Sequence, residues 1–401
     1  MIDTVVSHED KTSREVVLRQ LESIDWNFSG SGTLEHSVHS LHWFPGNFIP
    51  EIPAFLVQIL SRPGDLVLDP FCGSGTTGIE ALLQGRRAIL SDINRAGLQV
   101  AEGKLALLSG KETSTCLLRL AHALFWESVL QTQEVGRNGE GADPELLSWF
   151  DTSTLGQLRF IWKLINSVSE PRARSVANLL FSDVLFACAY TPGSRTTSGK
   201  RRRHHWGWIA DNVKPRSLVP HNAIAMFRER LFRATDVSDL LDFRGEASGS
   251  VHRWDARSLP LAESSVDVVI CSPPYLNMID YARANRLTYL WYGWPLEDDK
   301  RSEIGARFAR SRKSGVEDYL AQIKMSFGEI ARCLKPSGYC AVVIGVSRPQ
   351  GERLLTLFLE NATNGLRQIW GPKRRVSTRR RISDRNGTEP AEYLCVFQRD
   401  H

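Results

Sequence analysis

Short apolar runs alternate with amphipathic segments in two separate parts of the chain, a pattern typical of α/β proteins. Six of these runs predict strands, at residues 65–69, 87–92, 250–255, 266–271, 339–345 and 392–397. Helices are predicted among them at residues 78–83, 98–108, 287–294, 319–334 and 354–362. Because most of the strands are apolar almost throughout, they indicate a doubly wound, mostly parallel Rossmann-like sheet with helices on both faces.

The α/β rhythm is interrupted in the middle of the chain. Residues 109–247 contain two apolar-faced helical candidates, at 144–166 and 172–189, but no strand pattern. We therefore predict one α/β domain in two halves, residues 1–108 and 248–401, with residues 109–247 as an insertion. Two further helices are expected before the first strand, at residues 13–24 and 52–60.

Composition narrows the class of protein but does not name a partner. The 401 residues are 42% hydrophobic and 24% charged, with a formal net charge of +5, as in soluble globular proteins. The first residues show no secretory signal, and no apolar run is long enough to span a membrane, so we expect a cytoplasmic protein. The seven cysteines form no CxxC pair, which favours reduced thiols over a zinc site or a disulfide framework.

A glycine-rich loop separates the first predicted strand from its helix. The order is strand, Pro70-Phe71-Cys72-Gly73-Ser74-Gly75-Thr76-Thr77, helix, and a second strand that ends in Asp92. Glycines allow the backbone to approach a ligand closely, and an acid at the second strand tip can accept hydrogen bonds from ribose hydroxyls. The loop lacks the G-x-G-x-x-G fingerprint, and Asp69 precedes it. A carboxylate there would repel a pyrophosphate, so the loop favours S-adenosylmethionine over NAD.

The strand at 266–271 stops at Ser272-Pro273-Pro274-Tyr275. Two prolines cannot continue a strand, because each lacks an N–H and has a fixed φ. Asp69, Asp92, Asp255 and Ser272 all fall at predicted strand ends. Since the carboxyl ends of parallel strands share one edge of a sheet, these polar groups are expected to converge on one cleft.

The insertion contains a polar, cationic and aromatic stretch without periodicity. Such a composition suits phosphate contact combined with base stacking. The residues predicted to bind nucleic acid are Arg195, Lys200, Arg201, Arg202, Arg203 and Trp206. We interpret the insertion as the target-recognition region.

The glycine loop and Ser272–Tyr275 together resemble the motifs of the amino-methylating DNA methyltransferases, which use S-adenosylmethionine. The resemblance covers about residues 43–95 and 251–397 and implies a class I methyltransferase fold. It implies that residues 42–50 line the methionine end of the cofactor and that Asp255-Ala256-Arg257 meets the adenine ring. The expected cofactor-binding residues are Phe44, Asp69, Pro70, Phe71, Gly73, Gly75, Thr76, Thr77, Asp92, Asp255 and Ala256.

In that family the Ser-Pro-Pro-Tyr motif binds the exocyclic amine of a flipped base, which implies catalytic roles for Ser272, Pro273, Pro274 and Tyr275. Acceptors for both amine protons, at Ser272 and the Pro273 carbonyl, would favour a pyramidal nitrogen that attacks the methyl group directly. Tyr275 could stack on the extruded base. No metal is needed, and we interpret Cys271 as a buried thiol rather than a nucleophile.

Serine at position 272 favours cytosine N4 as the target, because many adenine-N6 enzymes carry aspartate there. Adenine N6 and an RNA guanine N2 remain open, as does a non-catalytic nucleic-acid-binding protein on a decayed fold, although the intact motifs argue against decay. A nicotinamide oxidoreductase is disfavoured by Asp69. The resemblance also implies double-stranded DNA as partner and a setting beside a restriction endonuclease.

Overall fold

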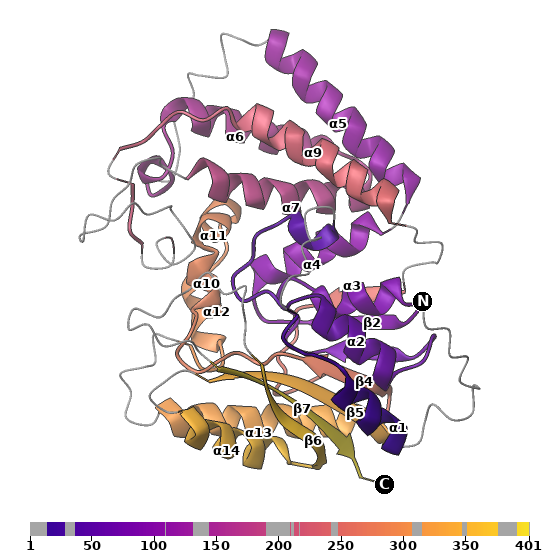
Figure 1. Cartoon of the computed structure of the whole chain (residues 1–401). Helices are drawn as coiled ribbons and strands as arrows, with labels where there is room; N and C mark the ends of the chain where they lie inside the picture. The colour runs from indigo at the N-terminus through magenta and orange to yellow at the C-terminus, as the bar shows by residue number, and fades with distance from the viewer. Residues whose placement is uncertain are drawn as a thin grey trace.

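A seven-stranded sheet forms the centre of the protein (Figure 1). The computed structural model describes residues 14–28, 37–108, 110–130, 144–189, 209, 212–215, 217–241, 248–306, 315–346, 351–375 and 391–400. The strands are β1 (Leu66–Asp69), β2 (Arg87–Ser91), β3 (Gly249–His252), β4 (Val266–Cys271), β5 (Leu334–Val346), β6 (Leu366–Arg375) and β7 (Ala391–Arg399).

The strand order is β3-β2-β1-β4-β5-β7-β6. Strands β1 to β5 pair in parallel, whereas β7 lies antiparallel to both β5 and β6. The chain runs outward from β1 to β3 and then crosses back to place β4 on the other side of β1. This arrangement confirms the predicted doubly wound, mostly parallel sheet, with its topological switch point between β1 and β4.

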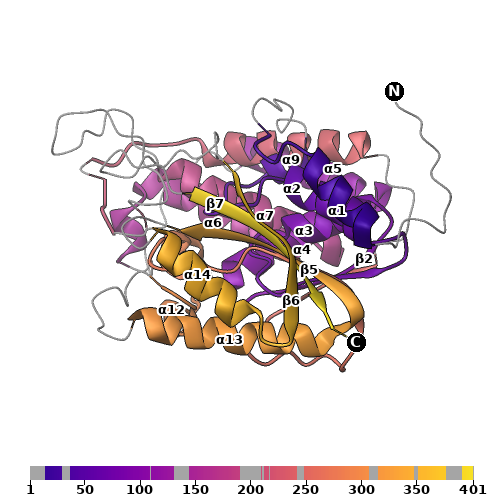
Figure 2. The same cartoon turned by 60° about the horizontal axis from the view of Figure 1, so that its bottom comes forward.

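Alternate residues of the central strands point into two separate cores. In β4, Val268 and Ile270 belong to the core that includes α2 (Glu51–Leu60), α3 (Thr76–Leu83) and α4 (Arg95–Leu107). Val269 and Cys271 belong to the core beneath α13 (Gly315–Cys333) and α14 (Gly351–Ala362), which lie together on the opposite face of the sheet (Figure 2). This burial on both faces explains why the strand sequences are apolar almost throughout.

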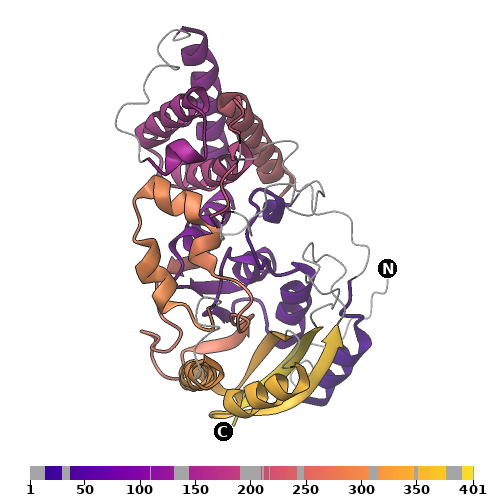
Figure 3. The same cartoon turned by 90° about the vertical axis from the view of Figure 1, so that its left-hand side faces the viewer.

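The insertion forms a helical layer on α4. It begins after α4 and contributes α5 (Lys111–Leu130), α6 (Thr152–Ser167), α7 (Pro171–Cys188) and α9 (Ala223–Leu240) before the chain enters β3. Helices α4 and α7 pack so closely that a Cβ at Gly103 would lie 2.6 Å from the Leu179 Cβ. The helical layer lies at one end of the molecule and α13 and α14 at the other (Figure 3).

Three short helices follow β4: α10 (Tyr281–Ala284), α11 (Arg286–Tyr292) and α12 (Leu296–Ser302). Helix α1 (Arg14–Ser23) lies near the outer strands of the sheet, where Glu22 accepts a hydrogen bond from the Trp370 indole at 2.7 Å. None of the described helices is long and apolar enough to cross a membrane.

Several elements differ from the sequence-based expectations. Helices α5, α9 and α12 and strand β6 were not predicted. In α9, α12 and β6 the apolar positions are interspersed with charged residues, which suggest a solvated segment. Strand β6 continues to Arg375, whose side chain is buried and pairs with Glu392 of β7. Strand β5 begins at Leu334 rather than Tyr339, since Leu334 already pairs with Val266 of β4.

Candidate active site

The two motif-bearing loops leave neighbouring strands at the switch point. Strand β1 ends at Asp69 and β4 at Cys271, and the two strands are paired through Leu68 and Val269. The glycine loop and the Ser-Pro-Pro-Tyr segment therefore start from adjacent positions on the carboxyl edge of the sheet. The tertiary structure thus brings together two motifs that are about two hundred residues apart in the sequence.

The glycine loop has the backbone conformation that requires glycine. Gly73 and Gly75 have φ of +48° and +79°, in the left-handed region. A Cβ at Gly75 would lie 2.8 Å from the Ala101 Cβ of α4, so the loop also rests directly on that helix. Thr76 and Thr77 are buried in the first turn of α3, and Pro70 is buried behind the loop, whereas Phe71 and Gly73 are partly exposed.

Asp69 is a buried carboxylate at the tip of β1. Its Oδ1 accepts a hydrogen bond from the Phe71 N–H at 3.0 Å, and no basic side chain pairs with it among the described residues. Burial raises its pKa to about 7. A buried carboxylate in this state favours a cationic ligand group, because such a group would offset the cost of ionisation.

Asp92 is bonded to the loop from the tip of β2. Its Oδ2 accepts the Gly73 N–H and its Oδ1 the Asn94 N–H, both at 2.9 Å. Burial raises the pKa of Asp92, although these backbone hydrogen bonds act in the opposite direction. The side chain stays partly exposed, so its oxygens can still accept hydrogen bonds from a ligand.

The Asp69→Asn variant is expected to change stability in a pH-dependent way. In the folded protein the pKa is about 7 and its ordinary value is 3.8, so the folded state holds a proton more tightly than the unfolded state. The stabilisation that comes from the proton on Asp69 is then fully present below pH 4 and is lost as the pH rises towards 7. We expect the asparagine variant to gain relative stability over this range by about 1.4 kcal/mol per pH unit at most.

Urea unfolding of both proteins at pH 4.5, 6 and 8 measures this effect. Asparagine keeps the acceptor for the Phe71 N–H, so the comparison isolates the ionisable proton. A stability difference that is the same at all three pH values would contradict the assignment of a proton to Asp69.

Phe44 packs against the glycine loop from the N-terminal side. A Cβ at Gly73 would lie 3.4 Å from the Phe44 ring, and that ring stacks on Tyr281 of α10 with centroids 6.5 Å apart. Next to it, the Ser74 hydroxyl donates to the Asn47 Oδ1 at 2.6 Å. Residues 44–47 therefore form a strap across the loop.

The described residues fit S-adenosylmethionine. The buried Asp69 carboxylate, which has no ion-pair partner among the described residues, matches the ammonium group of such a ligand. The acid at the tip of β2 matches its ribose hydroxyls. The two left-handed glycines let the loop backbone approach the ligand closely. The residues that would hold it are Phe44, Asp69, Gly73, Gly75 and Asp92.

Asp255 makes an internal ion pair. Its carboxylate accepts from the Arg257 guanidinium at 2.6 and 2.9 Å, and Ala256 is buried. Arg257 thus already occupies part of the hydrogen-bond acceptor capacity of Asp255, the residue that is expected to contact the adenine ring.

The Ser272 hydroxyl is oriented by the protein. Its oxygen lies 3.2 Å from the Val343 carbonyl oxygen and 3.3 Å from the Tyr275 hydroxyl. A serine has one hydroxyl hydrogen and two acceptor lone pairs. With either acceptor, the hydroxyl hydrogen points into the protein. The lone pairs of the Ser272 oxygen remain for a donor such as an amine N–H.

The carbonyl groups of the two prolines differ in their hydrogen bonding. The Pro274 carbonyl accepts from the Tyr319 hydroxyl at 3.1 Å, whereas the Pro273 carbonyl accepts no hydrogen bond from any described residue. Cys271 is fully buried and burial raises its pKa, which agrees with its interpretation as a structural thiol.

The ring of Tyr275 packs against Gly345 of β5. A Cβ at Gly345 would lie 2.0 Å from the Tyr275 ring, and the hydroxyl donates to Glu392 Oε1 at 3.5 Å. Glu392 is in turn held by the buried Arg375. Strands β5, β6 and β7 thereby fix the ring of the motif.

The Gly345→Ala variant is expected to lower the rate of the methyl transfer predicted from the sequence about 100-fold, because the added methyl displaces Tyr275 and a small misplacement of a positioning group has effects of that size. Gly345 has no positive φ, so the backbone tolerates alanine. The rate constant under single-turnover conditions measures the effect. Gly328→Ala is the matched control, since Gly328 lies on α13 and a Cβ there would meet the end of the flexible Asn364 side chain. Equal rates in the two variants would refute the role of Gly345.

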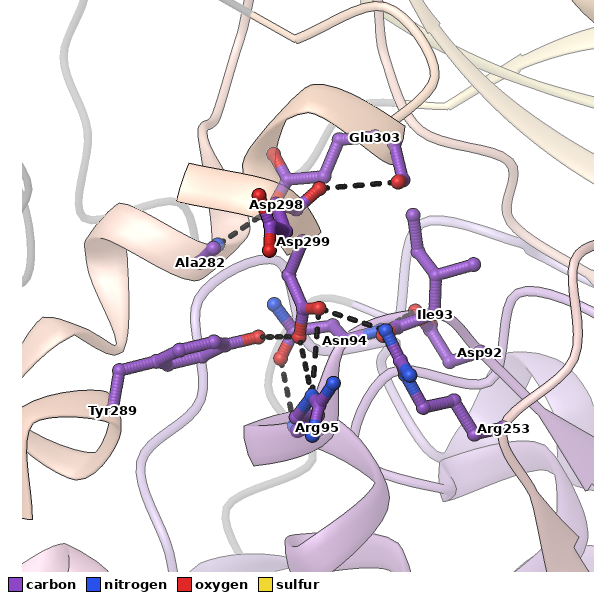
Figure 4. Close-up of polar contacts among 12 residues, drawn as sticks. Asp92, Ile93, Asn94, Arg95, Arg253, Ala282, Tyr289, Asp298, Asp299 and Glu303 are labelled. Atoms are coloured by element: carbon purple, nitrogen blue, oxygen red, sulfur yellow. Dashed lines mark hydrogen bonds and ion pairs between the residues drawn. The ribbon is translucent and has the colours of Figure 1, made fainter. Parts of the chain in front are cut away.

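A buried carboxylate on α12 joins three other segments beside Asp92 (Figure 4). Asp299 accepts from the Tyr289 hydroxyl at 2.8 Å, from Arg253 at 2.8 Å and from Arg95 at 3.2 Å. Arg253 also donates to the Ile93 carbonyl at 3.3 Å. Helix α12 is thereby tied to the turn after β2, which carries Asp92.

The same helix end also holds α10. The Glu303 carboxylate accepts the N–H groups of Tyr281 at 3.0 Å and Ala282 at 2.6 Å. Burial raises the pKa of Glu303 to about 8. Since Tyr281 stacks on Phe44, these contacts link the segment after the Ser-Pro-Pro-Tyr motif to the strap over the glycine loop.

The predicted nucleic-acid-binding residues Arg195, Lys200, Arg201, Arg202, Arg203 and Trp206 lie outside the described residues. Sequence reasoning missed Asn47, Tyr281, Asp299, Glu303 and Gly345. Only the first two had a signal, because they stand within or just after segments already singled out. The others acquire their contacts from segments distant in the sequence.

Comparisons with known proteins support the resemblance. Residues 7–103 match the family model described as DNA methylase, of the N6/N4 type. The chain is 20% identical to the type II methyltransferase M.MjaII of Methanocaldococcus jannaschii, across 77% of this chain and 72% of that protein. It is 21% identical to M.MvaI of Kocuria varians, across 66% of this chain and 59% of that protein.

Among solved structures, the chain resembles an S-adenosylmethionine-dependent methyltransferase from Methanosarcina mazei. The match has 12% identity and a TM-score of 0.31 and covers 88% of this chain and 99% of that chain. A likeness at this TM-score is no basis for assigning the fold, which is assigned from the strand order instead.

Proposed function

We propose, from this chain's membership of the amino-methylating DNA methyltransferase family, that it transfers a methyl group from S-adenosylmethionine to cytosine N4 at a specific DNA sequence. The observation that carries the proposal is the Ser272 hydroxyl, whose hydrogen is directed to acceptors of the protein beside the glycine loop. The lone pairs of its oxygen can take a hydrogen bond from the exocyclic amine of either cytosine or adenine, and the choice of cytosine N4 rests on the serine at position 272, as the resemblance implies.

The exocyclic amine is a poor nucleophile, because its lone pair is delocalised into the ring. Ser272 Oγ and the Pro273 carbonyl would each accept a hydrogen bond from one amine N–H and favour a pyramidal nitrogen. Its lone pair would form the new N–C bond as the methyl C–S bond breaks, and the methylated amine would then release one proton to water. Both acceptors are held by the sheet edge and by the proline pair, so they need no reorganisation when the base arrives. When bound, S-adenosylmethionine supplies an electrophilic methyl group on a positively charged sulfur.

The target base must leave the duplex to reach this edge, because its amine is otherwise enclosed in a base pair. The exposed part of the Tyr275 ring is proposed to stack on the extruded base. Gly345 supports the ring on the sheet side.

We also propose the insertion, residues 109–247, as the target-recognition region. Its helix α7 packs directly on the helix that follows the Ser-Pro-Pro-Tyr segment: Ser182 lies 2.8 Å from the Thr288 hydroxyl of α11, and Phe181 contacts Trp291 edge-to-face at 5.1 Å. DNA held by the insertion would therefore lie beside the proposed amine site. The basic stretch from Arg195 to Trp206 is proposed to contact phosphates and bases.

Transfer of a tritiated methyl group to DNA, followed by mass spectrometry of the nucleosides, tests the proposal. We expect label in DNA as N4-methylcytosine, and single-molecule sequencing of DNA from expressing cells would give the sequence context. N6-methyladenine as the product would overturn the choice of base. Label in structured RNA but in no DNA would overturn DNA as the substrate.

A further inference from the structure

Helix α4 carries a fully buried lysine directly behind the glycine loop. Lys104 is 0% exposed, and its Nζ donates to the Ser74 Oγ at 3.3 Å. Within the described part of the chain this is its single hydrogen-bond acceptor, and no carboxylate lies within ion-pair distance. A buried ammonium group with one neutral acceptor is costly, so the site lacks a negative charge.

Packing of α4 against the loop fixes where this lysine points. A Cβ at Gly97 would lie 2.9 Å from the Gly73 carbonyl oxygen, and Ala101 meets Gly75 one turn later. Lys104 is the next residue on the same face of the helix, where it meets Ser74. The amine is therefore held between the helix and the loop.

The Ser74 hydroxyl connects Lys104 to the strap. It accepts from Lys104 and donates to the Asn47 Oδ1 at 2.6 Å. The lysine, the loop and the strap thus share one chain of hydrogen bonds at the side of the loop where residues 42–50 cross it. This is the side expected to receive the methionine end of the cofactor.

Other charged groups near Lys104 do not supply the missing anion. His39 pairs with Glu80 at 2.8 Å and His42 with Ser182 at 3.0 Å. Burial lowers the pKa of both imidazoles, and the charge of Lys104 lowers it further. Burial likewise lowers the pKa of Lys104 to about 7 and raises that of the neighbouring Cys72 thiol.

We propose that Lys104, positioned by its hydrogen bond to the Ser74 oxygen, is the counter-charge for the α-carboxylate of S-adenosylmethionine. The inference rests on the proposed function and deepens it. Asp69 and Lys104 are buried groups of opposite sign that both contact or adjoin the glycine loop. A zwitterionic amino acid carries both complementary charges, so one ligand satisfies both groups.

Calorimetric binding of two ligands to Lys104→Met tests the proposal. S-Adenosylhomocysteine carries the α-carboxylate, and its decarboxylated analogue carries a hydrogen in that place. We expect the variant to lose about 10- to 100-fold in affinity for the first ligand, as for the loss of a charge-assisted hydrogen bond. Affinity for the decarboxylated analogue is expected to stay within about twofold, because that ligand never used the charge.

Lys111→Met is the matched control, since Lys111 is an exposed lysine at the start of α5 and should leave both affinities unchanged. Methionine fills the volume of the lysine stem, so ligand-free Lys104→Met is expected to unfold in urea no earlier than the wild type. If that variant fails to fold, Lys104→Gln takes its place.

Two outcomes overturn the inference. The first is an unchanged affinity of Lys104→Met for S-adenosylhomocysteine, and the second is an equal loss for both ligands, which would indicate a structural role. Both leave the proposed function intact, because the wild type still binds cofactor. Failure of the wild type to bind either ligand would instead overturn the proposed function and this inference together.

Discussion

Ser272→Ala is expected to reduce methyl transfer about 100- to 1,000-fold, the range seen when one preorganised hydrogen-bonding group is removed from a transition-state site. Cofactor affinity should stay within about twofold, because the residues proposed to hold the cofactor lie on β1, β2 and the strap. The alanine removes one acceptor for the amine and also the hydroxyl that lies against the Val343 carbonyl and the Tyr275 hydroxyl. Quench-flow measurement of a single turnover, with calorimetry for the cofactor, separates the two effects.

Ser265→Ala is the matched control for this prediction. Ser265 lies just before β4, at the opposite end of the same strand, and its hydroxyl donates to the Ala262 carbonyl at 2.7 Å. Its removal should leave the rate unchanged. If Ser272→Ala turned over as fast as this control, the amine would have to be held by other groups.

Asp299→Asn is expected to lower the free energy of unfolding by about 3 kcal/mol, because it leaves two arginines and a tyrosine hydroxyl without their shared carboxylate. The Asp299 side chain is 1% exposed. Loss of the pairs also releases α12 from Arg95 and Arg253, which lie beside the turn that carries Asp92 (Figure 4). We therefore expect weaker cofactor binding together with the lost stability.

The neighbouring residue gives a sharp control. Asp298 is 71% exposed and lies 3.8 Å from the equally exposed Arg301. Asp298→Asn should change stability by no more than about 0.5 kcal/mol, as for other surface pairs. Urea unfolding of both variants, with and without S-adenosylhomocysteine, measures the difference. Similar losses in the two variants would show that the buried network contributes little.

Much of the sheet could be predicted from local patterns. Strands β1, β2 and β4 are short, apolar and bounded by glycine, proline or acidic residues, so their positions follow from the sequence alone. Helix α12 could not be predicted, because its sequence LEDDKRS has no apolar face of its own. Its Asp299 becomes a buried residue only when Arg95 and Arg253 are brought to it from distant segments.

Lys104 illustrates the same limit within a helix that was predicted. A lysine in an amphipathic helix suggests a solvated side chain, because charged residues are almost never fully buried without a partner. The burial of Lys104 comes from two surfaces at once, the glycine loop on one side and the insertion helices on the other. Neither surface is encoded near residue 104.

By itself, the sequence determined the doubly wound fold, the glycine loop with its preceding acid and the proline-stopped strand, since each depends on residues close together in the chain. Only the tertiary structure decided that the two loops lie on paired strands and that Ser272 directs its hydrogen either to β5 or to its own motif. It also decided which acids and cations are buried. Burial and pairing depend on which distant segments share a surface, and no local pattern contains that information.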